Sequence, residues 1–522
     1  MNELIKKFSH VVKGVITGFD RIVFKGWMLP LMHAQGAMDF CRRRGLLNKD
    51  YKAWMMEQSG VIVRDAAESV EKQCGGKIQP LGSLKIRKKD ELARPRQGVA
   101  GAGHGLIGIW SAVEACSSYK AHFCAQSGYP QLKKEWTRCK HLYYYFDDEE
   151  FGLMSVRQQT WFPYPIQIAL NGREWLRRSL EKCGCDFQMK GNKFLSIGDY
   201  ELAQGLLDRQ LRTRWEGCLN RFVRRVFPAM KRILGPDLDY YWTLWQCEWA
   251  TDLIFQSREA LGEIKDALIR QAWMTGTSTR VMRYFDCPLT QSGRPDARMT
   301  DEVNSRLLDY WDGLRVKHCV GSNSAKFYTE ENNARAETTT NQPGKFKVHR
   351  RAQGEKKSAP KKRRPLRKGV ADIALRAQVS QEINDRLMNQ LATCSHETLV
   401  RQLLDPYCRR RIKHGRPVRA LDFIGKDRAL LQAISDPAFC VSGITNRTLR
   451  EKLQRQPGYK SHTPKQICAK ISRQLRLLRD HGLIRKMPRQ NCYHLTAEGR
   501  QLTTTLNALL SASTQQLMAA AA

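Results

Sequence analysis

Residues 461–499 read SHTPKQICAKISRQLRLLRDHGLIRKMPRQNCYHLTAEG and carry the clearest structural pattern in the chain. After Thr463-Pro464, apolar residues recur at helical spacing, and polar or basic residues lie on the opposite side. The apolar positions are Ile467, Ile471, Leu475 and Leu478. The opposite side carries Lys465, Ser472, Arg473 and Arg476. The pattern predicts an amphipathic helix with a basic outer face.

The second half of the stretch predicts a turn between two strands. Gly482 is a typical helix-stopping residue, and residues 483–486 and 493–496 have strand character on either side of a turn at 488–491. Two further helices are expected upstream, at 426–435 and at 445–453, where Thr445 can serve as the cap. Three helices followed by a two-stranded wing is the layout of a winged helix-turn-helix.

In that layout one helix enters the major groove and the wing contacts phosphates. The expected nucleic-acid contacts are Lys465, Ser472, Arg473 and Arg476 on the helix, and Arg485, Lys486 and Arg489 on the wing. The alternative is a small helical domain with a solvated basic face.

The charge balance indicates the class of partner. The chain has 522 residues, with 88 Lys and Arg against 51 Asp and Glu, which gives a formal charge of +37. Such a surface attracts polyanions and releases their counterions. DNA is the first expectation and RNA the alternative. A membrane is not expected, because the basic residues are interleaved with strands and aromatic residues rather than gathered on one helix.

No apolar run approaches the ~20 residues that cross a bilayer, and no signal sequence is evident. The expected location is the cytoplasm, in association with the nucleoid. The sequence leaves a homodimer open.

The residues before the basic stretch predict an α+β fold with a mainly antiparallel sheet and packed helices. A hairpin or a bulged strand is expected at 11–26, around residues 17–20. The aromatic run at 238–255 is interpreted as core rather than as a stacking surface for bases. The expected domains are an α+β domain at 1–200, a helix-rich segment closing with a three-stranded meander at 201–341, a basic linker at 342–369, a helical connector at 370–422 and the winged helix-turn-helix at 423–512.

The stretch 342–369 is crowded with cations and has only Glu355 against them. Such a composition cannot bury a core, so a linker or exposed loop is expected. Lys361, Lys362, Arg363 and Arg364 are its densest run and are expected to lie near phosphates. The alternative is a solvated spacer.

Six stretches carry a resemblance over nearly the full length. They are GFDRIVFKG at 18–26, FGLMSVRQQTWFPYPIQIALNGREWL at 151–176, YYWTLWQCEWATD at 240–252, ETTTNQPGKFKVHR at 337–350, PLRKGVADI at 365–373 and HGLIRKMPRQNCYHLTAEGR at 481–500. In them the chain resembles a family of bacterial proteins that are often present in several copies per genome and carry a MarR-like winged helix at the C-terminus. Multiple copies would suit a mobile element.

A shorter stretch, 324–340, is similar to a hairpin of replication initiators from filamentous phages and rolling-circle plasmids. The chain has Thr329-Glu330 where those proteins favour Asp-Lys, and it lacks their His-hydrophobe-His motif. A relaxase-type mechanism is therefore not expected.

An enzymatic alternative is a metal-dependent nuclease, transposase or initiator-like enzyme, which would need two to four carboxylates around Mg²⁺. Four acids lie in otherwise apolar segments: Asp20, Glu248, Asp252 and Glu337. Of these, Glu248 and Asp252 are at helical i, i+4 spacing. An acid in such surroundings is either paired or functional, and the structural ion pair is the leading interpretation. No cofactor is certain, and the glycines at 98–105 lack the Lys-Ser/Thr ending of an ATP-binding loop.

Overall fold

The computed structural model describes thirteen stretches of the chain, and in one of them the side chain of residue 402 is not described. They are residues 3–82, 92–93, 104–287, 303–310, 313–352, 354–356, 358–392, 400–413, 415–436, 439, 443–460, 462–487 and 490–513. The chain forms two compact units from alternating segments. We call residues 14–254 with 337–381 the body, and residues 1–13, 255–336 and 382–522 the companion unit.

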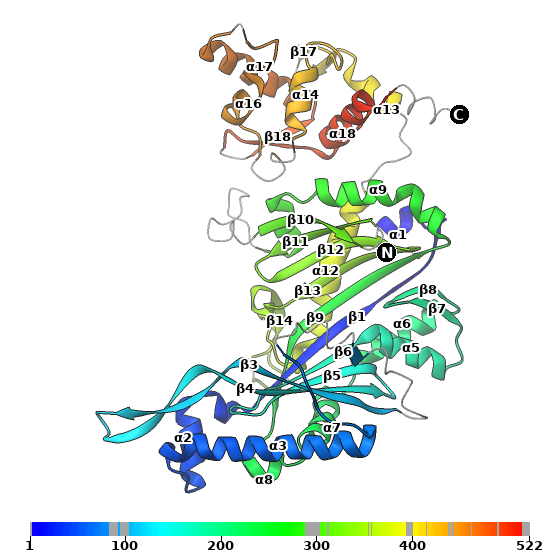
Figure 1. The fold of residues 1–522 in the computed structure, drawn as a ribbon. Helices are drawn as coiled ribbons and strands as arrows, with labels where there is room; N and C mark the ends of the chain where they lie inside the picture. Colours follow the sequence, from blue (N-terminus) through cyan, green and yellow to red (C-terminus); the bar gives the residue numbers. More distant parts are fainter. Residues whose placement is uncertain are drawn as a thin grey trace. The chain divides into compact units, whose positions relative to one another are not determined.

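A large sheet dominates a mixed α and β fold (Figure 1). Neighbouring strands of this sheet are mainly antiparallel, as expected from the sequence. The strand order is β10-β11-β12-β13-β9-β1-β6-β5-β4-β3-β2, and the short β2 pairs parallel with β3. The strands of this sheet that lie wholly or mostly in the body are β1 (Val12–Trp27), β2 (Gln79–Pro80), β3 (Gly105–Cys124), β4 (Tyr129–Asp148), β5 (Gly152–Gln159), β6 (Ile166–Asn171) and β9 (Tyr241–Phe255).

The helix at Trp215–Val226 packs on this sheet against apolar residues of β1. Phe24 of β1 is buried, and its ring centroid lies 4.7 Å from that of Trp215. The helices that lie wholly in the body are α2 (Ala34–Arg43), α3 (Tyr51–Cys74), α5 (Gly172–Lys182), α6 (Tyr200–Gln210), α7 (Trp215–Val226) and α8 (Met230–Leu234). Short elements complete the set: η1 (Leu29–Met32), η2 (Asn48–Asp50) and the hairpin β7 (Phe187–Lys190) with β8 (Lys193–Ile197).

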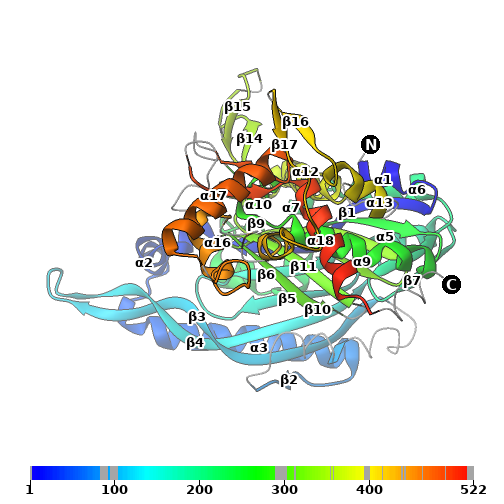
Figure 2. The ribbon, with the colours of Figure 1, turned by 90° about the horizontal axis from the view of Figure 1, so that it is seen from above.

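β3 and β4 form a long two-stranded ribbon that reaches past the neighbouring strands (Figure 2). Their pairing runs from Gly105↔Asp147 to Cys124↔Tyr129. α3 packs against β3. Gly75, at a φ of 62°, ends α3 in the left-handed conformation that favours glycine.

Of the two expectations for residues 11–26, a hairpin or a bulged strand, the hairpin is wrong, because one continuous strand, β1, covers residues 17–20. Gly18 does not make a turn; a Cβ there would lie 2.9 Å from Leu207 of α6, so the glycine permits close packing of helix on strand. Asp20 therefore lies within a strand and not at a hairpin.

The aromatic run forms the strand β9, so the expected helical spacing of Glu248 and Asp252 is wrong. Four residues along a strand span roughly 13 Å. Tyr240, Trp242 and Trp249 are buried, in agreement with the core interpretation. Tyr241 and Trp245 depart from it, because they are 40% and 39% exposed.

The basic stretch is a small hairpin rather than a linker. β14 (Lys347–Arg350) pairs antiparallel with β15 (Lys362–Pro365). Its base is anchored by Phe346 and Leu366, which are 5% and 2% exposed and are joined by a backbone hydrogen bond of 2.8 Å. The turns η4 (Pro343–Lys345) and η5 (Val370–Asp372) flank it. The segment is therefore ordered despite its charge, because the two apolar residues at its base are buried.

The companion unit contains a meander of four strands where three were expected. β10 (Val303–Tyr310) pairs with β11 (Gly313–Val320), which pairs with β12 (Asn323–Glu330). β13 (Asn333–Thr340) completes the meander and ends in the body. The accompanying helices are α1 (Glu3–Lys7), α9 (Arg258–Met274) and α10 (Ser278–Tyr284).

The expected helical connector is helical only in part. α12 (Ile373–Leu391) and α13 (Val400–Leu404) are followed by η6 (Asp405–Tyr407) and by a hairpin of β16 (Arg411–Lys413) with β17 (Arg416–Val418). Within the described residues, no helix is both long and apolar enough to cross a membrane.

Residues 428–511 form helices and a small hairpin around their own core. The elements are α14 (Arg428–Ile434), α16 (Asn446–Leu453), α17 (Pro464–Asp480), β18 (Ile484–Lys486), β19 (Tyr493–Leu495) and α18 (Ala497–Ser511). Leu430, Leu449, Ile471 and Leu502 are fully buried in this core. The expected helices and strands are therefore present, with α18 added.

Candidate nucleic-acid interface and acidic pocket

α17 separates apolar and basic residues on two sides, as its sequence predicts. Ile467, Ile471, Leu475 and Leu478 are all buried, whereas Lys465, Ser472, Arg473 and Arg476 are all exposed. Thr463 begins the helix with a capping box, in which its side chain accepts from the Gln466 backbone and the Gln466 side chain accepts from the Thr463 backbone. The helix therefore starts at a defined residue and presents a fixed basic face.

α16 holds this face in place from one side. The Asn446 side-chain amide donates to Ser472 Oγ and to the Cys468 carbonyl, both at 2.9 Å. Thr445 caps α16 with its own capping box. Ser472 is thus engaged by α16, while Arg476 is 60% exposed and lies 3.9 Å from Asp480.

A hollow of about 400 Å³ adjoins the same side of α17. It is lined by Arg419, Lys426, Asp427, Lys470, Arg473, Gln474 and Leu477. Arg419 donates two hydrogen bonds, of 2.6 and 2.7 Å, to the Asp427 carboxylate. With that carboxylate paired, the remaining lysines and arginine give the hollow a positive character suited to a phosphate.

The hairpin that follows α17 also carries exposed cations. Arg485 and Lys486 are exposed on β18. Ile444 pairs with Tyr493 through two backbone hydrogen bonds of 2.7 and 2.8 Å, which adds a third short segment to the hairpin. Arg489, the third expected contact of this hairpin, lies outside the described residues.

In the basic hairpin, three of the four expected phosphate contacts are exposed. Lys361, Lys362 and Arg363 are exposed, and Arg364 is half-buried and pairs with Glu355 at 2.7 Å. The charge of Arg364 is thus already compensated by a carboxylate.

The four candidate acids do not gather in one place. Asp20 and Glu248 line a pocket of about 280 Å³ in the body. Asp252 instead forms a fully buried ion pair with Arg173, 2.8 Å from its Nη2 atom. Glu337, on β13, is 4% exposed and does not line the pocket. Within the described residues, no three His, Cys, Asp or Glu side chains come together in a way that could hold a metal ion.

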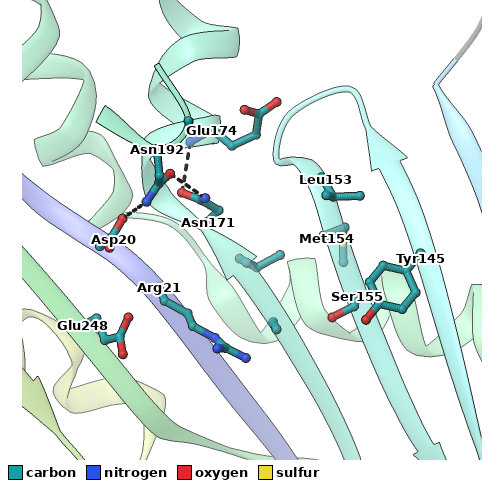
Figure 3. A pocket seen from close by; sticks show the side chains of 13 residues that line it. Asp20, Arg21, Tyr145, Leu153, Met154, Ser155, Asn171, Glu174, Asn192 and Glu248 are labelled. Atoms are coloured by element: carbon teal, nitrogen blue, oxygen red, sulfur yellow. Dashed lines mark hydrogen bonds between the residues drawn. The ribbon is translucent and has the colours of Figure 1, made fainter. Parts of the chain in front are cut away.

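The pocket lies where α5 begins (Figure 3). Asn171 caps α5 by accepting from the backbone of Arg173 and Glu174 at 2.8 and 3.2 Å. Its amide donates to Asn192, which in turn donates to Asp20. This chain of hydrogen bonds orients the Asp20 carboxylate beside the helix N-terminus.

The other acids at the pocket are also engaged. Glu174 accepts from Arg177 at 2.5 and 3.0 Å, and Glu248 accepts from Gln246 at 3.1 Å. Arg21 is an exposed member of the lining. Three acids and an arginine with these partners form a polar pocket, but not the converging carboxylates that Mg²⁺ chemistry requires.

Sequence reasoning missed Asn171, Glu174 and Asn192. The first two could have been found from the Asn-Gly-Arg-Glu order at 171–174, which is a helix N-cap with an acid three residues later. Asn192 lies in the turn between β7 and β8 and had no signal of its own.

Comparison with protein-family models, with curated proteins and with solved structures finds no match to the chain.

Proposed function

We propose that this protein binds nucleic acid, DNA before RNA, and that residues 423–512 act as a winged helix-turn-helix that recognises a duplex. The observation that carries the proposal is the basic face of α17. Lys465, Arg473 and Arg476 are exposed on the side opposite the core. A helix with this distribution can lie in a major groove, with its arginines directed to guanine edges and phosphates.

Three further features support this assignment. The capping boxes at Thr445 and Thr463 define where α16 and α17 begin. The β18–β19 hairpin follows α17 directly and carries the exposed Arg485 and Lys486, the kind of side chain with which a wing would contact phosphates. The charge of +37 supplies the general attraction to a polyanion.

A metal-dependent nuclease is not proposed as a second function. Its candidate acids are dispersed: Asp20 and Glu248 line the pocket, Asp252 is in a buried ion pair, and Glu337 lies on β13 outside the pocket.

The test is binding of the 522-residue chain to duplex DNA. A pool of random duplexes of about 30 base pairs is selected on the wild type, and the affinity for selected and unselected duplexes is then measured by fluorescence anisotropy. Arg473→Ala/Arg476→Ala should weaken binding to the selected duplex by roughly 1–3 kcal/mol per lost contact and reduce its preference over the unselected duplex.

Arg42→Ala/Arg43→Ala is the matched control, because it removes two exposed arginines from α2 in the body. It should leave the preference for the selected duplex unchanged. Unchanged affinity of the α17 double variant for the selected duplex, or failure of the wild type to retain any duplex at low salt, would overturn the proposal.

A further inference from the structure

Three large aromatic side chains and two lysines gather on one side of the body sheet. Trp27 ends β1, Tyr241 and Trp245 belong to β9, and Lys25 and Lys368 accompany them. We call these five residues the platform. Tyr241 and Trp245 are 40% and 39% exposed although β9 is otherwise mostly buried. Exposed aromatic ring surface at two positions on the same face of one strand indicates a binding surface.

The lysines lie against the tryptophan rings. Lys25 Nζ is 4.1 Å from the ring centroid of Trp27 and 4.6 Å from that of Trp245. Lys368 Nζ is 4.8 Å from the ring centroid of Trp245. The two tryptophan rings are 6.1 Å apart, and Trp27 Nε1 donates to Thr243 Oγ1 at 3.0 Å. These contacts hold both rings in position and place positive charge beside them.

The segment that carries Lys368 is fixed to β9 by its backbone. The Leu244 amide donates to the Lys368 carbonyl at 2.7 Å, and Thr243 forms a bridge with Gly369. A Cβ on Gly369 would lie 2.8 Å from the Tyr241 hydroxyl, so the absence of a side chain there lets Tyr241 lie against the segment. The platform is therefore built before any ligand arrives.

A salt bridge next to this segment joins it to the basic hairpin. Arg367 donates to Asp372 at 2.9 and 2.7 Å. Arg350 of β14 lies 3.8 Å from the same carboxylate. The basic hairpin is thus joined through Asp372 to the segment that carries Lys368.

The charge of the platform is not compensated locally. Neither Lys25 nor Lys368 forms an ion pair with a carboxylate among the described residues. Partial burial, together with the charges of Arg157 and Lys368, lowers the pKa of Lys25 to about 8. A ligand that brings negative charge to this surface would relieve the repulsion between these cations.

We propose that the platform binds single-stranded nucleic acid, with bases stacked on Trp245 and Tyr241 and the phosphates near Lys25 and Lys368. Exposed rings between cations suit an unpaired strand, because its bases offer π-faces that a duplex keeps inside its stack. Stacking does not distinguish DNA from RNA, so either strand fits. This site goes beyond the duplex-binding function proposed above and does not depend on it.

The experiment uses the 522-residue chain and measures, by anisotropy, its binding of fluorescein-labelled oligothymidylate and oligouridylate of about 12 nucleotides. Trp245→Ala should weaken binding of both oligonucleotides roughly 5- to 100-fold, the loss expected from one base-ring stack. Trp245→Phe should retain most of the affinity, because it keeps a ring. Thermal unfolding monitored by circular dichroism verifies that each variant is folded.

Two control variants separate this site from others. Trp136→Ala removes a tryptophan that is 76% exposed on the β3–β4 ribbon, and it should leave the affinity unchanged. Arg473→Ala/Arg476→Ala should also leave single-strand binding unchanged, whatever it does to duplex binding. Failure of the duplex experiment therefore does not decide this one.

Three results would overturn the proposal. They are no binding of either oligonucleotide at low salt, equal affinity of the wild type and folded Trp245→Ala, or a loss on Trp136→Ala that Trp245→Ala does not reproduce. The last result would assign the strand to the ribbon instead.

Discussion

The buried pair of Arg173 and Asp252 gives the sharpest test of whether a candidate acid is structural. Both side chains have no exposed surface, and the closest contact is 2.8 Å. Arg173 Nη2 also donates to the Ala250 carbonyl at 3.0 Å. Asp252→Ala would leave the guanidinium in the core without the carboxylate that balances it. Two unit charges about 4 Å apart interact by about 4 kcal/mol at an effective dielectric constant of about 20.

That magnitude agrees with the 3–5 kcal/mol typical of breaking a buried ion pair, so Asp252→Ala should lower the free energy of unfolding by roughly 3–5 kcal/mol. The assay is equilibrium urea unfolding followed by circular dichroism. Glu149→Ala is the control: it removes an acid that is 71% exposed and pairs with Lys182 at 3.3 Å, so it should cost less than about 1 kcal/mol.

Arg173→Met/Asp252→Leu removes both charges and should recover much of the loss. A change of less than about 1 kcal/mol in Asp252→Ala would refute the structural role, since that is the range of an exposed pair. So would a variant of unchanged stability that had lost nucleic-acid binding.

Three other outcomes are expected. Lys25→Met should stabilise the body at neutral pH by about 1–3 kcal/mol, because the pKa of Lys25 is lowered to about 8 and folding therefore disfavours its charge. The wild type should gain stability as the pH rises from about 8 towards 10.5, because in this range only the unfolded chain still holds the Lys25 proton, and Lys25→Met should lack that gain. Melting temperatures of both proteins across this pH range test the expectation. Parallel pH profiles of the two proteins would contradict it. Thr463→Ala should cost roughly 0.5–2 kcal/mol in thermal unfolding and Thr463→Ser much less, since the serine hydroxyl can still cap α17; equal losses in the two variants would argue against the cap. Replacing Lys361, Lys362 and Arg363 with Gln should weaken all duplexes alike and flatten the dependence of affinity on salt by about 0.9 in logarithmic slope per lost phosphate contact; an unchanged slope would remove the hairpin from the interface.

Local sequence signals determined the C-terminal elements. In α17 a threonine cap, a proline at the first turn and apolar residues at helical spacing all favour the same helix, and Gly482 adopts a φ of 78° just beyond its end. Each of these effects acts over a few residues, so it can be predicted from the sequence without knowledge of the fold.

The same reasoning failed where burial covered both faces of an element. β9 is almost entirely buried from Cys247 onward, so its apolar residues do not alternate with polar ones, and its acids fell by coincidence at helical spacing. The prediction for the basic hairpin was also wrong. The net charge of the segment predicts a linker, whereas two apolar residues at its base anchor it.

The sequence by itself therefore determined the α+β class, the basic surface and the two-sided character of α17. Only the tertiary structure decided which acids meet and which are neutralised. Asp20 and Glu248 approach one pocket because β1 and β9 are neighbours in the sheet, and Asp252 is removed from it by a buried arginine. The platform likewise joins β1, β9 and the segment after the basic hairpin. The physical reason is that helix caps and periodicity act between neighbours in sequence, whereas strand pairing brings together side chains that lie far apart along the chain.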